Sequence, residues 1–107
     1  MLIWVDDERD VPSPGWVLAR TAELAIGLLN SHEGNIQTLS LDHDLGPPEA
    51  GTGYDVIKWV EEWVFTDPNY HPPKHIQCHS SNASGRININ LAIESIEREM
   101  VRRTNSG

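Results

Sequence analysis

The sequence predicts an α/β domain in which helices cover both faces of a mainly parallel four-stranded sheet, a three-layer α/β/α sandwich. Four short apolar runs of strand length alternate with segments whose apolar residues recur every three or four positions, as on one face of a helix. Strands that alternate with helices are joined by crossovers, which make neighbouring strands parallel. The chain has 107 residues, the length of one domain, and we expect 1–107 to form it, with a frayed tail over 102–107.

The first half of the chain supplies two strands and a helix. Residues 2–5 form a continuous apolar run, which predicts a strand buried on both faces. Two prolines and a glycine within 11–15 exclude a regular helix there, and 16–19 are the second predicted strand. Thr21 is a suitable N-cap for the helix that follows. One face of that helix carries Ala22, Ala25, Ile26 and Leu29.

The second half continues the alternation. Residues 36–41 are the third predicted strand, and the next helix begins at Thr52, with Asp55 placed to complete a capping box. Residues 74–79 are the fourth and most polar strand, and a polar turn over 80–86 leads into the last helix. The apolar stripe of that helix is Ile89, Ala92, Ile93, Ile96 and Met100.

The composition excludes several classes of function. Sixteen acidic and eight basic residues give a net charge of −8, which argues against binding to extended duplex nucleic acid or to an anionic membrane. The single cysteine, Cys78, cannot form an internal disulfide. The first residues lack the basic segment of a signal peptide, and no apolar run approaches the ~18 residues of a membrane span. We therefore expect a cytoplasmic protein.

Reactive side chains follow three of the four predicted strands. Asp6 and Asp7 follow the first strand, an Asp-His-Asp sequence at 42–44 follows the third, and His79 with the polar turn follows the fourth. The carboxyl ends of parallel strands lie at one edge of the sheet, where open α/β sheets bind ligands. The three segments are therefore expected to meet in one pocket.

The acidic residues in this group are candidate metal ligands. Clustered carboxylates repel one another unless a positive charge neutralises them. Asp6, Asp7 and Asp42 therefore predict a site for a hard divalent cation such as Mg²⁺, which prefers oxygen ligands. The alternative is that the acids at 6 and 7 are solvated or cap a turn. No organic cofactor is predicted.

The histidines are candidates for proton transfer. His43 lies between Asp42 and Asp44, whose carboxylates can orient its ring, and His79 is expected to approach from the adjacent strand. Two histidines beside a phosphorus centre can act as general base and general acid. The alternative is that each is a hydrogen-bonded structural residue.

The turn before the last helix is a candidate phosphate site. Small residues let backbone N–H groups approach an anion, and a helix N-terminus favours negative charge. An arginine can add a bidentate contact. Ordinary capping by Asn82 or Ser84 is the alternative, and the two interpretations are compatible. The candidate residues are Ser80, Ser81, Asn82, Ser84, Gly85 and Arg86.

Taken together, these motifs resemble those of a known family. The set is similar to the cyclic-phosphate-processing receiver-like family, a divergent branch of the response-regulator receiver domains, over residues 2 to about 96. The resemblance implies a truncated flavodoxin- or receiver-like fold. The motifs that carry it are Val5-Asp6-Asp7-Glu8, Leu41-Asp42-His43-Asp44-Leu45-Gly46, Thr52-Gly53-Tyr54-Asp55 and His79-Ser80-Ser81-Asn82-Ala83-Ser84-Gly85.

The resemblance also implies a function. It assigns His43 and His79 as a catalytic pair and matches Asp6, Asp7 and Asp42 to the receiver's acidic pocket, in a phosphodiesterase acting on RNA 2′,3′-cyclic phosphate ends or cyclic nucleotides. Asp42 and Asp44, which flank His43, are further candidate catalytic residues. A proline-rich loop in place of the first helix, and the lack of a counterpart to the receiver's fifth strand and its lysine, count against phosphorylation by a kinase. Two alternatives remain: a non-catalytic module that binds a nucleotide or a protein partner, and a phosphoacceptor on Asp42.

Overall fold

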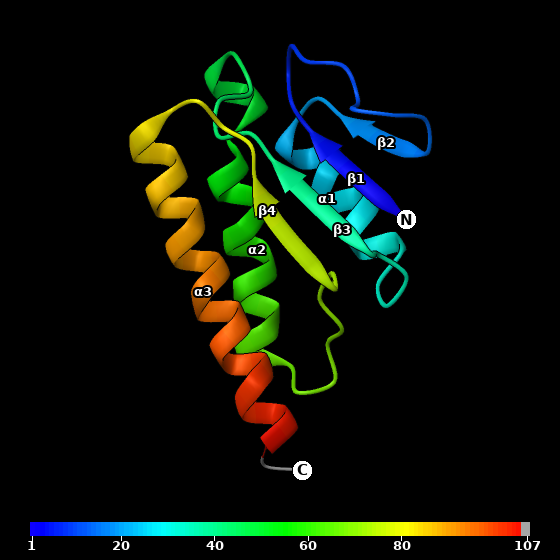
Figure 1. The fold of residues 1–107 in the computed structure, drawn as a ribbon, viewed down its shortest axis with the longest axis vertical. Helices are drawn as coiled ribbons and strands as arrows, with labels where there is room; N and C mark the ends of the chain where they lie inside the picture. Colours follow the sequence, from blue (N-terminus) through cyan, green and yellow to red (C-terminus); the bar gives the residue numbers. More distant parts are fainter. Residues whose placement is uncertain (106–107) are drawn as a thin grey trace.

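The computed structural model describes residues 1–105 and contains every predicted strand and helix (Figure 1). The elements are β1 (Leu2–Val5), β2 (Trp16–Ala19), α1 (Ala22–Ser31), β3 (Thr38–Leu41), the 3₁₀ turn η1 (Pro48–Ala50), α2 (Gly53–Thr66), β4 (His75–Cys78) and α3 (Ala83–Asn105). The third strand begins two residues later than predicted. α3 continues through most of the predicted frayed tail, of which only residues 106–107 lie outside the described residues.

The four strands form one parallel sheet in the order β2-β1-β3-β4, which confirms the predicted α/β class. Val5 pairs with Ala19 on one side and with Leu41 on the other, and Leu41 pairs with Cys78. The last residues of all four strands are therefore level. The segments that follow β1, β3 and β4 emerge together at one edge, as the strand pattern predicted.

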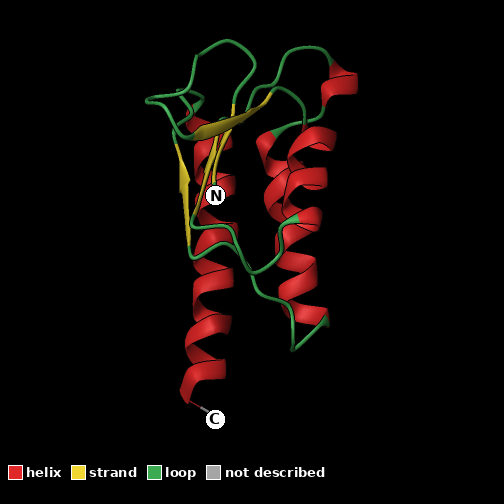
Figure 2. Ribbon diagram, turned by 90° about the vertical axis from the view of Figure 1, so that its right-hand side faces the viewer, coloured by secondary structure: helices red, strands yellow, loops and turns green. Residues whose placement is uncertain are grey.

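α1 and α2 lie on the same face of the sheet, and α3 packs beside β4 and α2, so the helices do not cover both faces and the predicted three-layer sandwich is corrected to two layers (Figure 2). The crossovers β2–α1–β3 and β3–α2–β4 advance across the sheet in the same direction. Right-handed crossovers that advance in one direction place their helices on one face. The connection from β1 to β2 is a loop, so no helix covers the opposite face within residues 1–105.

The core therefore lies between one face of the sheet and the helices. Ile3, Val5, Leu39 and Leu41 point toward the helices and are fully buried. Trp4 lies between Ile3 and Val5 in β1, so its side chain points to the opposite, helix-free face, where it is half-buried.

Capping side chains and one arginine fix the helices. Thr21 accepts a hydrogen bond from the backbone of Leu24, and the capping box of Thr52 and Asp55 is complete, as predicted. Near the C-terminus of α3, the Arg103 guanidinium donates to backbone carbonyls in the last turn of α2 and in the loop after it, those of Val64, Asp67 and Tyr70. This anchor accounts for the continuation of α3 to Asn105. Neither α3 nor any other helix in the described part of the chain is long and apolar enough to cross a membrane.

Candidate functional site

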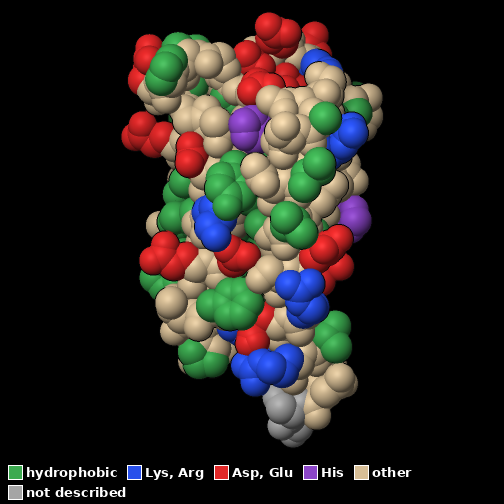
Figure 3. Space-filling model, turned by 90° about the vertical axis from the view of Figure 1, so that its left-hand side faces the viewer, with side chains coloured by type: hydrophobic (Ala, Val, Ile, Leu, Met, Phe, Trp, Pro, Cys, Tyr) green, Lys and Arg blue, Asp and Glu red, His purple; other side chains and the backbone are tan. Residues whose placement is uncertain are grey.

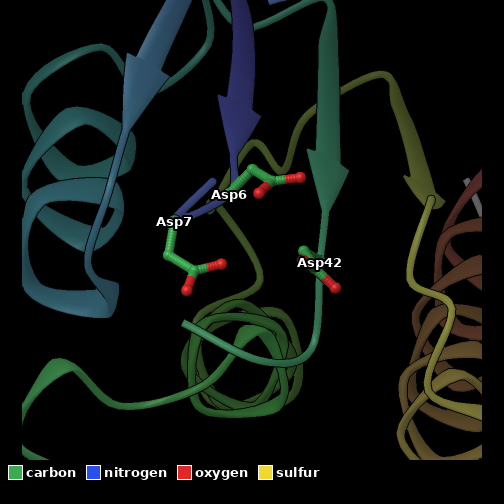
Figure 4. A group of neighbouring side chains, drawn as sticks. All are labelled: Asp6, Asp7 and Asp42. Carbon is green, nitrogen blue, oxygen red and sulfur yellow. The ribbon is translucent and has the colours of Figure 1, made fainter. Parts of the chain in front are cut away.

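Three aspartates converge at the carboxyl edge of the sheet, where the sequence placed them. Asp6 and Asp7 follow β1 and Asp42 follows β3 (Figure 4). One carboxylate oxygen of each lies within 4.8 Å of those of the other two. Asp6 is fully buried, and the other two are partly exposed.

Asp6 is held as a carboxylate by its surroundings. Its Oδ1 accepts the backbone N–H groups of Glu8 and Arg9, each at 2.9 Å, in the turn that ends β1. Its Oδ2 lies 3.0 Å from His79 Nε2 and 3.7 Å from the Arg9 guanidinium. Burial by itself would raise the pKa of Asp6, but the hydrogen bonds from Arg9, Glu8 and His79 outweigh it and lower that pKa.

The donor set suits a hard divalent cation. Two ligands on opposite sides of one Mg²⁺ lie about 4.2 Å apart, since each bond is about 2.1 Å long. The three carboxylates lie within 4.8 Å of one another, a span somewhat longer than that limit, so not all three need to bind the ion directly. One or two direct carboxylate ligands with water at the other positions would satisfy this geometry, which is the usual Mg²⁺ arrangement. Asp6, Asp7 and Asp42 therefore form a group that fits Mg²⁺.

His79 is fixed on the helix-free side of the sheet by three contacts. Its ring stacks on Trp4, with centroids 3.7 Å apart and planes 4° from parallel. Nε2 faces Asp6, and Nδ1 lies 2.7 Å from Ser40 Oγ. A carboxylate only accepts hydrogen bonds, so Nε2 carries the proton and Nδ1 accepts from Ser40. Burial lowers the pKa of His79, and the attraction of Asp6 only partly offsets this. The ring is therefore neutral, with both nitrogens engaged.

The order Ser40–His79–Asp6 has the connectivity of a hydrolase triad, but it cannot supply a nucleophile. Ser40 is fully buried, and its Oγ also accepts a hydrogen bond from Gln77 at 3.1 Å. A nucleophile must reach its substrate, so Ser40 instead orients the His79 ring.

His43 lies against the first turn of α3. Its ring packs on Gly85, where a Cβ atom would come within 2.3 Å of His43 Cγ. Nδ1 lies 3.1 Å from Asp44 Oδ1 and therefore carries the proton. This leaves Nε2 as a proton acceptor, and no group in the described part of the chain donates a hydrogen bond to it. The side chain is 21% exposed.

The turn before α3 caps the N-terminus of that helix, which is one of the two compatible interpretations of the sequence. Asn82 Oδ1 accepts the N–H of Gly85 at 2.9 Å, and Ser80 Oγ accepts the N–H of Asn82 at 3.1 Å. Ser80 is buried by this role, whereas Ser81, Ser84 and Arg86 are exposed.

Asn82 also ties this turn to the acid beside His43. Its Nδ2 donates to Asp44 Oδ2 at 3.1 Å. Hydrogen bonds from His43 and then Asn82 lower the pKa of Asp44. Asn82 thus links the helix cap and the Asp44–His43 pair in one network.

The predicted residues therefore fall into two adjoining groups. His79 belongs with the acidic cluster through Asp6, and His43 belongs with the α3 turn through Asp44 and Gly85. The groups are continuous along the chain, because Asp42 directly precedes His43 and His79 directly precedes the turn. No hydrogen bond joins the two imidazoles within residues 1–105.

Four residues at this edge were not predicted. The Arg9 guanidinium donates to the His79 carbonyl at 3.0 Å, and that of Arg20 donates to the carbonyls of Asp6 and Arg9. Trp4 and Ser40 hold the His79 ring. One signal was available: Ser40 is a polar residue inside an otherwise apolar strand, and a buried polar side chain needs a partner.

The fold and the site together define a receiver-like α/β domain: a parallel sheet with a cluster of acidic residues at its carboxyl edge. Residues 1–95 match the family model of the cyclic-phosphate processing receiver domain. The chain therefore belongs to that family, as its motifs suggested. Searches of the curated proteins and of the solved structures returned no match.

Proposed function

We propose that this domain is a hydrolase that opens cyclic phosphates, either 2′,3′-cyclic phosphate ends of RNA or cyclic nucleotides. One observation carries the proposal: an acidic cluster that could hold a cation, a histidine with a free proton-accepting nitrogen and a helix N-terminus adjoin one another at the edge of the sheet. These are the components needed to bind a phosphate and activate water beside it. Family membership favours a cyclic phosphate as the substrate class.

His43 is the proposed general base. Its Nε2 takes a proton from water as the water oxygen forms a bond to phosphorus. The bond from phosphorus to one ribose oxygen breaks, and that oxygen takes a proton from solvent at the exposed edge. The product is a phosphomonoester. Asp44 holds the His43 tautomer that leaves Nε2 free to accept, which is the usual role of a carboxylate behind a catalytic histidine.

In this proposal His79 is not the general acid of a histidine pair. Both of its nitrogens are engaged, and burial keeps its ring neutral, so it is a poor proton donor. We assign it as a positioning residue that holds Asp6 in the acidic cluster. A divalent cation on Asp6, Asp7 and Asp42 would offset negative charge on the phosphoryl oxygens.

The turn over 80–86 is the proposed phosphate cradle. The backbone N–H groups of Ala83 and Ser84 begin α3 and have no acceptor within the described residues. Unpaired N–H groups and the helix dipole attract anions at such a position. The exposed Arg86 can add a charged contact to the same phosphate.

Incubation of the protein with 2′,3′- and 3′,5′-cyclic nucleotides in Mg²⁺ buffer, followed by chromatography of the products, tests the proposal. We expect wild type to form phosphomonoester and His43→Ala to lose about 10²-fold or more of the rate, the usual contribution of a general base. His71→Ala, which removes an exposed histidine elsewhere, is the matched control. Wild type inactive on every cyclic phosphate, or His43→Ala as active as wild type, would refute it.

A phosphoacceptor role for Asp42 is the second candidate. The observation that favours it is the partial exposure of Asp42 beside two further acids that could share a cation with it. Beryllofluoride, an analogue of an aspartyl phosphate, should then shift backbone NMR signals around β3 in wild type and not in Asp42→Asn. The hydrolase proposal predicts product formation whether or not beryllofluoride has this effect.

A further inference from the structure

The outward face of α3 carries an apolar stripe that the core does not use. Ile87, Leu91 and Val101 are 59%, 58% and 59% exposed. Figure 3, which faces this helix, shows apolar side chains along it with charged ones between and below them. Glu94 and Arg98 occupy the gap between Leu91 and Val101, and both are exposed.

The spacing of these five residues is that of a coiled-coil seam. From Ile87 to Val101 they follow one another at steps of four, three, four and three residues, which is the a/d pattern of two heptads. The residues that pack on the rest of the molecule lie on other positions of the helix: Ile89, Ala92, Ile93 and Ile96. α3 therefore presents a second, separate packing face.

The stripe is complementary to itself when two copies run antiparallel. In an antiparallel pair, a positions of one helix meet d positions of the other. One register places Leu91 against Val101 of the second copy and Glu94 against Arg98 of the second copy, and two-fold symmetry repeats both pairs. Shifting the register by one heptad instead sets Leu91 against Glu94 and Ile87 against Arg98. The first register joins Leu91 with Val101 and acid with base, and it leaves Ile87 opposite Asn105 at the ends of the pair, whereas the shifted register forms neither match.

We propose that α3 is a homodimerisation surface, through which two copies of this chain associate as an antiparallel helix pair in that register. The charge pattern identifies the partner as a second copy, because an isologous interface requires a patch that is its own complement. Five side chains from one helix cover less than the about 800 Å² per partner of a standard interface. The dimer is therefore expected to be in exchange with monomer.

One residue opposes this arrangement and provides an internal check. Glu97 occupies a flanking g position, where in this register it faces Glu97 of the second copy near the two-fold axis. Like charges across an interface weaken association. Glu97→Gln is therefore expected to tighten the dimer.

Sedimentation velocity over a range of protein concentrations tests the proposal. We expect concentration-dependent dimerisation in wild type. Glu94→Arg alone and Arg98→Glu alone should each weaken it by about tenfold or more, because each sets like charges in contact. The double swap Glu94→Arg with Arg98→Glu should restore the affinity to within about threefold of wild type, because it recreates both pairs. Glu62→Arg, an exposed charge reversal on α2, is the control and should leave association unchanged.

The outcomes decide the proposal in either direction. Restoration by the double swap, with circular dichroism showing every variant folded, establishes the antiparallel register. Wild type that remains monomeric at all concentrations would overturn the proposal. Dimerisation that neither single substitution weakens would also overturn it, since another face would then form the interface. The same holds if the single substitutions weaken dimerisation and the double substitution fails to restore it.

Discussion

Two glycines determine where the proposed base lies. A Cβ at Gly85 would come within 2.3 Å of His43 Cγ, and one at Gly53 would come within 2.0 Å of the Asp42 carbonyl oxygen. Neither glycine has a positive φ, so the requirement is for space rather than for an unusual backbone conformation. The loop that carries His43 can therefore lie directly against α2 and α3 only because these two positions lack side chains.

Gly85→Ala should displace His43 and reduce both stability and activity. Overpacking at a fixed contact costs about 1–3 kcal/mol of unfolding free energy, and urea unfolding measures this loss. Gly27→Ala is the matched control, because its Cβ would meet nothing within 4 Å on an exposed position of α1. That change should stabilise the protein by about 0.5–1 kcal/mol. Equal effects of the two substitutions would contradict the close contact at His43.

Tyr70 provides a prediction about pH. Burial, with a smaller effect of Glu33, raises the pKa of Tyr70 from its ordinary value of 10.0 to about 12. In the unfolded chain this phenol ionises at the ordinary value. The unfolding free energy should therefore be unaffected by Tyr70 below pH 10 and should fall as the pH rises from 10 to 12. Urea unfolding of wild type against Tyr70→Phe isolates the effect; parallel stability curves above pH 10 would rule it out.

At the scale of elements, the start of α3 combines a helix cap with the proposed site. Asn82 caps the helix through Oδ1 and contacts Asp44 through Nδ2. The two roles use opposite ends of one amide, so substitutions can separate them. A carboxylate at this position would still cap the helix but would repel Asp44.

Asn82→Ala should therefore lower the unfolding free energy by about 1 kcal/mol, the usual cost of losing an N-cap. Asn82→Asp should preserve much of that stability, because aspartate is an equally good cap. Both variants should lose hydrolytic rate, since neither holds Asp44 and His43 as asparagine does. Denaturant melts beside product assays check this. An Asn82→Asp protein with the rate of wild type would show that the contact with Asp44 has no role.

At the scale of the whole molecule, the number of layers shows what the sequence could and could not predict. Leu2 and Trp4 of β1, and Trp16 and Leu18 of β2, lie on the helix-free face. Apolar residues at both alternations of a strand predict burial on both faces. Here the large rings shield one another instead: Trp4 stacks on His79 and meets Trp16 edge to face at 5.6 Å. From one sequence, a sheet face covered by helices cannot be distinguished from a sheet face on which aromatic rings cover one another.

The candidate site was predicted in part for a similar reason. Asp6, Asp7 and Asp42 could be grouped because they lie within two residues of a strand end, and the ends of parallel strands meet. The contacts of the two histidines could not be predicted, because they depend on the side of the sheet to which each ring turns and on neighbours distant in sequence. Ser40 is 39 residues from His79, and nothing local joins them.

The acidic cluster should make stability depend on divalent cations. Mg²⁺ that binds the folded protein raises the free energy of unfolding by mass action, so thermal unfolding should shift upward as Mg²⁺ is added. Asp42→Asn should abolish this shift and, without cation, should be no less stable than wild type, because it relieves repulsion. Asp10→Asn, in the loop that carries Asp6 and Asp7 but outside the cluster, should keep the shift. An Mg²⁺ response that survives Asp42→Asn would place the ion elsewhere.

The most direct test of the proposed hydrolase is a crystal structure of His43→Ala, which should retain substrate, soaked with a 2′,3′-cyclic nucleotide and Mg²⁺. The account predicts the ion on Asp6, Asp7 and Asp42, and the phosphate against the first turn of α3 with its phosphorus facing the space vacated by the imidazole. A nucleotide bound on the helix-free face, or a phosphate out of reach of position 43, would contradict it.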